Sequence, residues 1–322
     1  MSDSSATSRP ARRPASLQGR VHSEYGDGDN LQPWLEEFGL EQDCPLFDGI
    51  YEYVLTTAGG TLAAAECLLS GAADIAIHWE GGRHHAARDH ASGFCYVNDV
   101  VLGIHRLQRG FDRILYIDLD LHHGDGVQNA FLYSRSVFTL SFHYHSPGFY
   151  PGTGSLREQG KGKAQNHALN VPLGRYLTDG SLRRVFDEIS ARVVSYFKPD
   201  VVVVQCGCDG LATDPHRAWN LTPVGYVSVI EAVRGWGLPT MLLGGGGYDS
   251  PSVARCWAQV TAAVTQPGVD LDREIPEHCY FEMYKPTFEI SIEPATAAVD
   301  ENSDEYIASV VAEVAERLRE NR

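Results

Sequence analysis

The chain has 322 residues, 43% of them apolar, which is enough for one large α/β domain or two ordinary domains. We expect no membrane span and no signal peptide, because no run of about 18 apolar residues occurs and the amino terminus lacks an apolar core. A formal net charge of −16 disfavours direct binding to nucleic acid, and it either attracts basic partners or serves solubility alone.

Residues 1–32 are rich in Ser, Arg, Pro, Gly and Asp, and we expect a disordered tail there, followed by one domain over 33–322. Helical patterns then alternate with short apolar runs. The expected strands are 74–79, 114–119, 137–142, 201–206 and 240–243, and the expected helices are 60–70, 96–108, 182–197, 224–236, 253–264 and 305–320. This alternation predicts an α/β fold with an open, mainly parallel sheet and helices on both faces.

Polar residues follow four of the expected strands. In parallel sheets, ligands bind beyond the carboxyl ends of the strands, so these residues should meet at one edge. They are His84 and His85 after the first strand, Asp118, Asp120, His122 and Asp125 around the end of the second, Asp214 after the fourth, and Tyr248 after the fifth.

The Asp118-x-Asp120-x-His122 pattern indicates a metal site. Alternate side chains of an extended segment share a face, and two carboxylates buried together need a cation. A catalytic zinc takes three protein ligands and keeps one position open. Asp120 and His122 can supply two ligands, and Asp214 can supply the third. The alternative is an acidic loop with capping residues, which the neighbouring histidine pair and glycine run make less attractive.

The histidine pair and the tyrosine suit the chemistry beside such a metal. A histidine near a metal-bound water is a natural general base, and Asp118 and Asp125 are available to orient His84 and His85. Adjacent histidines also occur on surfaces without any function. Tyr248 follows four glycines that allow close backbone approach, and its hydroxyl could donate to an oxyanion.

Several segments together resemble the class I zinc-dependent histone deacetylases. They are GGRHHAARDHASGFCYVNDVVLGI, RILYIDLDLHHGDGVQNAF, SPGFYPGTG and LGGGGYDSPSVARCW, in the family's order, and the likeness covers about residues 37–322. The resemblance implies the arginase/deacetylase fold. Residues 1–32 do not resemble the family's amino-terminal segment, so we expect the sheet to lack its first strand and the domain to be amino-terminally truncated.

The resemblance also implies roles by position. Zinc, or another divalent metal such as Fe²⁺, is expected on Asp120, His122 and Asp214, with His85 as general base, His84 as a second electrostatic histidine, and Asp118 and Asp125 as their partners. Tyr248 is expected to hold the acetyl oxygen. The substrate is expected to contact Asp43, Gly93, Phe94, Tyr150 and Leu221, and a monovalent cation, K⁺, is expected at Asp118, Ser141 and Phe142.

The implied activity is hydrolysis of N6-acetyl-lysine in proteins such as histone tails, which releases acetate and regulates chromatin and transcription. The implied setting is the nucleus, and also the cytoplasm, with corepressor proteins as partners and no direct contact with nucleic acid or membrane. Two alternatives stay open: a catalytically impaired relative that acts as a binding protein, and a deacetylase of small acetylated amines.

Overall fold

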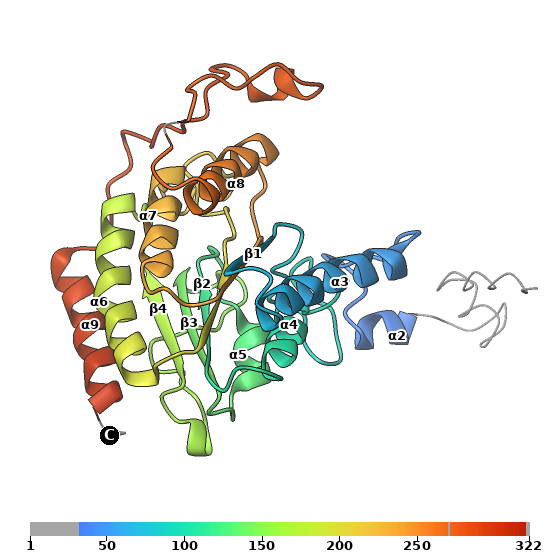
Figure 1. Cartoon of the computed structure of the whole chain (residues 1–322), viewed down its shortest axis with the longest axis vertical. Coiled ribbons are helices and arrows are strands. Elements are labelled where there is room, and N and C mark those ends of the chain that lie inside the picture. The colour runs from blue at the N-terminus through green and yellow to red at the C-terminus, as the bar shows by residue number, and fades with distance from the viewer. Residues whose placement is uncertain (1–31, 270, 320–322) are drawn as a thin grey trace, which may run out of the picture.

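The computed structural model describes residues 32–269 and 271–319, which are organised around one six-stranded sheet (Figure 1). The strands are β1 (Ile75–His78), β2 (Ile114–Asp118), β3 (Val137–Tyr144), β4 (Ala168–Leu173), β5 (Val201–Gln205) and β6 (Thr240–Leu243). Their order is β1-β6-β5-β2-β3-β4, and every neighbouring pair is parallel. The predicted parallel α/β sheet is confirmed, whereas residues 1–31 of the predicted tail lie outside the described residues.

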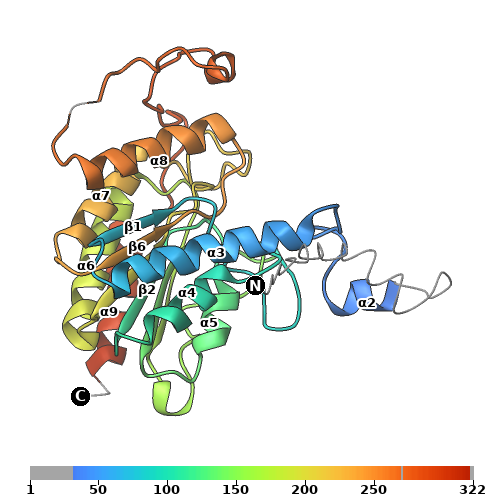
Figure 2. The same ribbon diagram turned by 45° about the vertical axis from the view of Figure 1, so that its right-hand side comes forward.

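Helices cover both faces of this sheet (Figures 1 and 2). One face packs against α3 (Ile50–Leu69), α4 (Asp99–Leu107) and α5 (Asp125–Phe131), and the other against α6 (Asp179–Phe197), α7 (Pro223–Arg234), α8 (Ser250–Thr265) and α9 (Asp304–Arg319). The remaining elements are α2 (Gln32–Glu37) and two short 3-10 helices, η1 (Gly162–Ala164) and η2 (Phe281–Tyr284). Within the described part of the chain, no helix combines the length and apolarity needed to cross a membrane.

Two hydrophobic cores follow from this layering. Successive side chains of a strand point to opposite faces, so β2 contributes Leu115 and Ile117 to one core and Ile114 and Tyr116 to the other. All five residues of β2 are buried. The central strands are therefore fixed on both sides, which holds their carboxyl ends in place.

Helix α3 starts ten residues earlier than residue 60, where the sequence pattern predicts it, and runs through Gly59 and Gly60. The prediction began only at Gly60, because glycine disfavours a helix interior. The structure gives a reason for Gly60: a Cβ there would lie 2.3 Å from Nε2 of His78 in β1. This close helix–strand approach is a tertiary demand that outweighs local propensity.

Strand β4 and helix α5 have no counterpart in the prediction. β4 contains Asn170 and Pro172 and therefore lacks a continuous apolar run, but it is an edge strand, where proline is tolerated. Helix α5 begins at Asp125, one of the residues assigned to chemistry. Its glycine-rich start makes it look like a loop in the sequence.

Candidate functional site

A cavity of about 130 Å³ lies beyond the carboxyl ends of β1, β2 and β6. Its lining includes His84 and His85 after β1, Asp120 after β2, Tyr248 after β6, and Phe94 from the segment before α4. Residues predicted from three separate strand ends therefore do meet at one edge of the sheet.

Asp120, His122 and Asp209 form a group that could hold a metal ion. All three are buried, and one potential ligand atom from each lies within 4.8 Å of the others. Nδ1 of His122 is 2.9 Å from Oδ2 of Asp209 and 3.3 Å from Oδ1 of Asp120. Ligand atoms about 2.0–2.1 Å from a tetrahedral zinc lie roughly 3.3 Å apart, so this donor set fits zinc in chemistry and spacing.

The third member of this group is Asp209, whereas the predicted third ligand is Asp214, whose role stays a prediction. Both carboxylates follow β5, but the oxygens of Asp214 are used elsewhere. Oδ1 accepts from the backbone N–H of His216 at 2.9 Å and lies 2.8 Å from His216 Nδ1. Oδ2 accepts from the backbone N–H of Tyr248 at 2.9 Å. Asp214 therefore joins two loops beside the group, and its carboxylate stays a predicted metal ligand.

The two carboxylates of the group differ in their electrostatic surroundings. Burial and the charge of Asp120 raise the pKa of Asp209 to about 7. Burial also opposes ionisation of Asp120, but His84 and His122 outweigh it and hold the pKa of Asp120 well below its usual value. The same carboxylates outweigh burial at His122 and raise its pKa to about 10. The group therefore favours a positive charge at its centre.

His84 and His85 each contact a carboxylate through Nδ1. His84 Nδ1 lies 2.8 Å from Oδ2 of Asp118, and His85 Nδ1 lies 2.8 Å from Oδ1 of Asp125. The turn that carries them is fixed by Asp99, whose carboxylate accepts from the backbone N–H of Gly82 and of Arg83. Sequence reasoning missed Asp99 because an aspartate in the first turn of α4 looks like an ordinary helix-start residue.

The pKa values of the two adjacent histidines shift in opposite directions. Burial and the charge of His84 lower the pKa of His85 to about 4. Burial also lowers the pKa of His84, but the charges of Asp118 and Asp120 outweigh this effect and raise the pKa of His84 to about 9. At neutral pH His84 is therefore charged, and His85 is a neutral base.

The glycine run after β6 lets the backbone reach the carboxylates. Gly246 donates its N–H to Oδ2 of Asp120 at 2.8 Å, and a Cβ at Gly246 would lie 2.4 Å from Oδ2 of Asp209. Tyr248 follows, with its ring 5.8 Å from that of Phe94. Burial and nearby carboxylates raise the pKa of Tyr248, so its hydroxyl keeps its proton.

The mouth of the site is aromatic. Tyr150 lies with its ring 4.9 Å from that of His85, and its hydroxyl is 2.6 Å from Ser92 Oγ. Gly93 has φ +55°, and a Cβ there would lie 2.5 Å from His85 Cδ2, so only glycine fits. Its N–H donates to Oδ2 of Asp43 at 2.9 Å. Four of the predicted substrate contacts, Asp43, Gly93, Phe94 and Tyr150, are thus brought together.

Leu221 does not join them. Its side chain is fully buried in the core, and its backbone pairs with Leu211 in an isolated bridge, so its contact with substrate stays a prediction. Two rings that the prediction left out lie there instead. Phe149 stacks on His122 with centroids 5.0 Å apart, and His216 lies 5.1 Å from His122 and 5.0 Å from Tyr248. The stretch SPGFYPGTG already contained Phe149 as a signal.

The residues predicted to hold a monovalent cation lie deeper. Asp118 pairs with Ser141 across β2 and β3, and Phe142 follows in β3. His143 Nε2 lies 2.8 Å from the carbonyl of Gly154, and burial and His123 lower its pKa well below the usual value. Neutral His143 therefore donates through Nε2, which leaves Nδ1 to accept from Ser141 Oγ at 2.9 Å. The oxygen lone pairs of Ser141 stay available.

The sequence of this chain is similar to proteins of one known family. A family model described as the histone deacetylase domain matches residues 15–264. Histone deacetylase 8 of Danio rerio is 44% identical over 299 residues, covering 93% of this chain and 78% of the relative. Histone deacetylase 8 of Xenopus laevis is 43% identical over 299 residues, covering 93% of this chain and 91% of the relative. Histone deacetylase 1 of Homo sapiens is 40% identical over 294 residues, covering 90% and 60%.

Proposed function

This chain belongs to the histone deacetylase family and is a lysine deacetylase, and we propose that it hydrolyses acetyl-lysine in proteins such as histones with zinc bound by Asp120, His122 and Asp209. The observation that carries the proposal is the convergence of this buried group, a histidine pair of opposite protonation and Tyr248 around one cavity. Zinc held there would polarise the acetyl carbonyl and lower the pKa of a bound water to about 7.

His85 is proposed as the base that takes the proton from the attacking water. Its Nδ1–H donates to Asp125, so the lone pair of Nε2 is free, and Nε2 has no hydrogen-bond partner among the described residues. The protonated base can then pass the proton to the leaving lysine nitrogen as the C–N bond breaks. His84, charged and held by Asp118, supplies positive potential beside the developing negative charge.

Tyr248 is proposed as the donor to the acetyl oxygen. Its hydroxyl keeps its proton and has no hydrogen-bond partner within the described part of the chain. Asp214 is proposed as a positioning residue, because its carboxylate accepts from the backbone N–H of Tyr248 and so fixes the start of that side chain. Phe94 and Tyr150 would flank the aliphatic part of the lysine, and Asp43, which holds Gly93 at the mouth, would contact its backbone.

A potassium ion is proposed at Asp118, Ser141 and Phe142. The buried Asp118 carboxylate and the free lone pairs of Ser141 are hard oxygen donors on neighbouring strands. A cation there would stabilise the strand ends that carry Asp120 and His122. We also propose that the protein acts in the nucleus, because histones are its proposed substrates, and that corepressor proteins are its partners there.

The test is a deacetylase assay on the purified chain with an acetylated histone-tail peptide. We expect turnover that chelation abolishes and zinc restores, together with weak turnover of acetylated polyamines. A chain that binds the peptide without releasing acetate after zinc is restored would refute the proposal. Preferential turnover of the polyamine would refute the substrate assignment alone.

A further inference from the structure

A second cavity, of about 440 Å³, lies at the amino-terminal ends of the strands, whereas the site described above lies beyond their carboxyl ends. It is formed where Arg113, Arg135 and His167 precede β2, β3 and β4, and where α6 ends at Phe197. Its volume is in the range of about 300–1,000 Å³ that is typical of ligand pockets. The proposed deacetylase chemistry makes no use of it.

The lining of this cavity carries positive charge that is not neutralised. Three permanent cations, Arg113, Arg135 and Lys198, line it, and none of the lining residues is a carboxylate. Only Arg113 is paired: its Nη2 lies 2.7 Å from Oδ1 of Asp200. Among the described residues, the side chains of Arg135 and Lys198 have no hydrogen-bond or ion-pair partner. Two unpaired cations around one hollow favour an anion there.

Lys198 stands in a backbone conformation that does not favour lysine. It caps α6 with φ +52°, in the left-handed region where glycine or asparagine is usual. A cation at a helix carboxyl end can be explained by the helix dipole. However, Nε of Arg113 already donates to the carbonyl of Lys198, and Arg135 belongs to a different element. The dipole therefore does not explain both unpaired cations.

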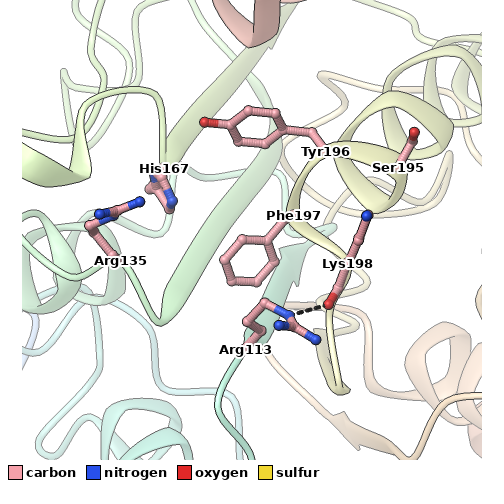
Figure 3. A pocket seen from close by; sticks show the side chains of 7 residues that line it. All are labelled: Arg113, Arg135, His167, Ser195, Tyr196, Phe197 and Lys198. Atoms are coloured by element: carbon pink, nitrogen blue, oxygen red, sulfur yellow. Dashed lines mark hydrogen bonds between the residues drawn. The ribbon is translucent and has the colours of Figure 1, made fainter. Parts of the chain in front are cut away.

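One wall of the cavity is aromatic. The ring of His167 lies 6.1 Å from that of Tyr196 and 5.9 Å from that of Phe197. Figure 3 shows Arg135 beside His167 on one side, Arg113 and Lys198 on the other, and the ring of Phe197 between them. Cations on two sides of an aromatic wall can hold a charged group and an apolar body together.

We propose that this cavity binds an organic phosphate, with the phosphate group between Arg135 and Lys198 and an aromatic body against Tyr196 and Phe197. Guanidinium and ammonium groups are the usual partners of phosphate oxygens. The site is separate from the deacetylase centre, and its existence does not depend on the proposed function.

The experiment measures binding of phenyl phosphate and of inorganic phosphate to the whole chain by calorimetry at constant ionic strength. The test variant is Arg135→Gln with Lys198→Asn, because asparagine tolerates the left-handed conformation. The control is Arg109→Gln with Arg234→Gln, which makes the same change of charge outside the cavity. We expect phenyl phosphate to bind more tightly than phosphate, and the test variant to lose at least about tenfold in affinity. The control should match the parent.

Deacetylase turnover is measured in the same preparations, and we expect the test variant to keep it. Unchanged affinity in the test variant, or an equal loss in the control, would overturn the proposed site. Equal affinity for phenyl phosphate and phosphate would overturn the assignment to an organic phosphate. If the double variant does not fold, Lys198→Asn alone provides the same test.

Discussion

Replacing Asp209 with asparagine should stabilise the protein when metal is absent. The carboxyl is 1% exposed, and burial and Asp120 raise its pKa from 3.8 to about 7. A carboxyl whose pKa is raised by folding destabilises the folded state while it is ionised, and this effect fades as the pH falls through 7 toward 3.8. The change corresponds to on the order of 4 kcal/mol above pH 7. Asparagine keeps an oxygen for the backbone N–H of Leu121, which donates to Asp209 at 2.8 Å.

The same substitution should have the opposite effect once zinc is added, because the variant loses a proposed ligand. Loss of an outer-shell partner typically lowers metal affinity about 10–100-fold, so we expect at least about 10³-fold here. The assay compares thermal melting of chelator-treated protein at pH 8 and pH 5.5, followed by titration with zinc. At roughly 2 °C per kcal/mol, the metal-free variant should melt several degrees above the parent at pH 8, and the difference should shrink at pH 5.5.

Asp214→Asn is the matched control, because it changes the next carboxylate along the same loop. We expect it to retain zinc and to lose turnover through the displaced Tyr248, whose N–H it holds. If Asp209→Asn kept its zinc while Asp214→Asn lost it, the assignment of Asp209 would be refuted.

Further variants test the other proposed roles. His85→Ala should lower turnover about 10²–10⁴-fold with zinc retained, and near-normal turnover would exclude it as the base. Asp125→Asn removes a carboxylate that raises the pKa of His85. The acid limb of the plot of kcat/KM against pH should therefore move to lower pH, and a move to higher pH would contradict this. Tyr248→Phe should cost about 10²–10³ in kcat without loss of zinc, and equal kcat would argue against an oxyanion donor. Gly93→Ala, with its Cβ 2.5 Å from His85, should destabilise the fold by about 1–3 kcal/mol in thermal melting; an unchanged melting temperature would show that the mouth relaxes freely.

Sequence reasoning succeeded where buried strands define the geometry. The apolar runs that end near Asp118 and Gln205 are unambiguous, and parallel strands bring their carboxyl ends to one edge. The positions of His84, His85 and Asp120 follow from this rule alone. It needs no knowledge of loop conformation.

The assignments that this rule does not decide lie in the loops. Asp209 and Asp214 follow the same strand five residues apart, and only the path of the backbone decides which carboxylate turns toward His122. The predicted place of Leu221 at the mouth rests on likeness of position, whereas the loop folds its side chain into the core. Side-chain type is visible in a sequence, but the direction of a side chain in an irregular segment is set by distant packing.

The carboxylate of Asp214 makes one mechanical unit of two loops. One oxygen holds His216 on the loop after β5, and the other holds the backbone of Tyr248 on the loop after β6. The backbone of Tyr248 cannot move outward without losing its hydrogen bond to the same carboxylate that holds His216. A displacement of His216 that reshapes the entrance therefore shifts the carboxylate that positions Tyr248, so the shape of the entrance and the position of the tyrosine are coupled through Asp214.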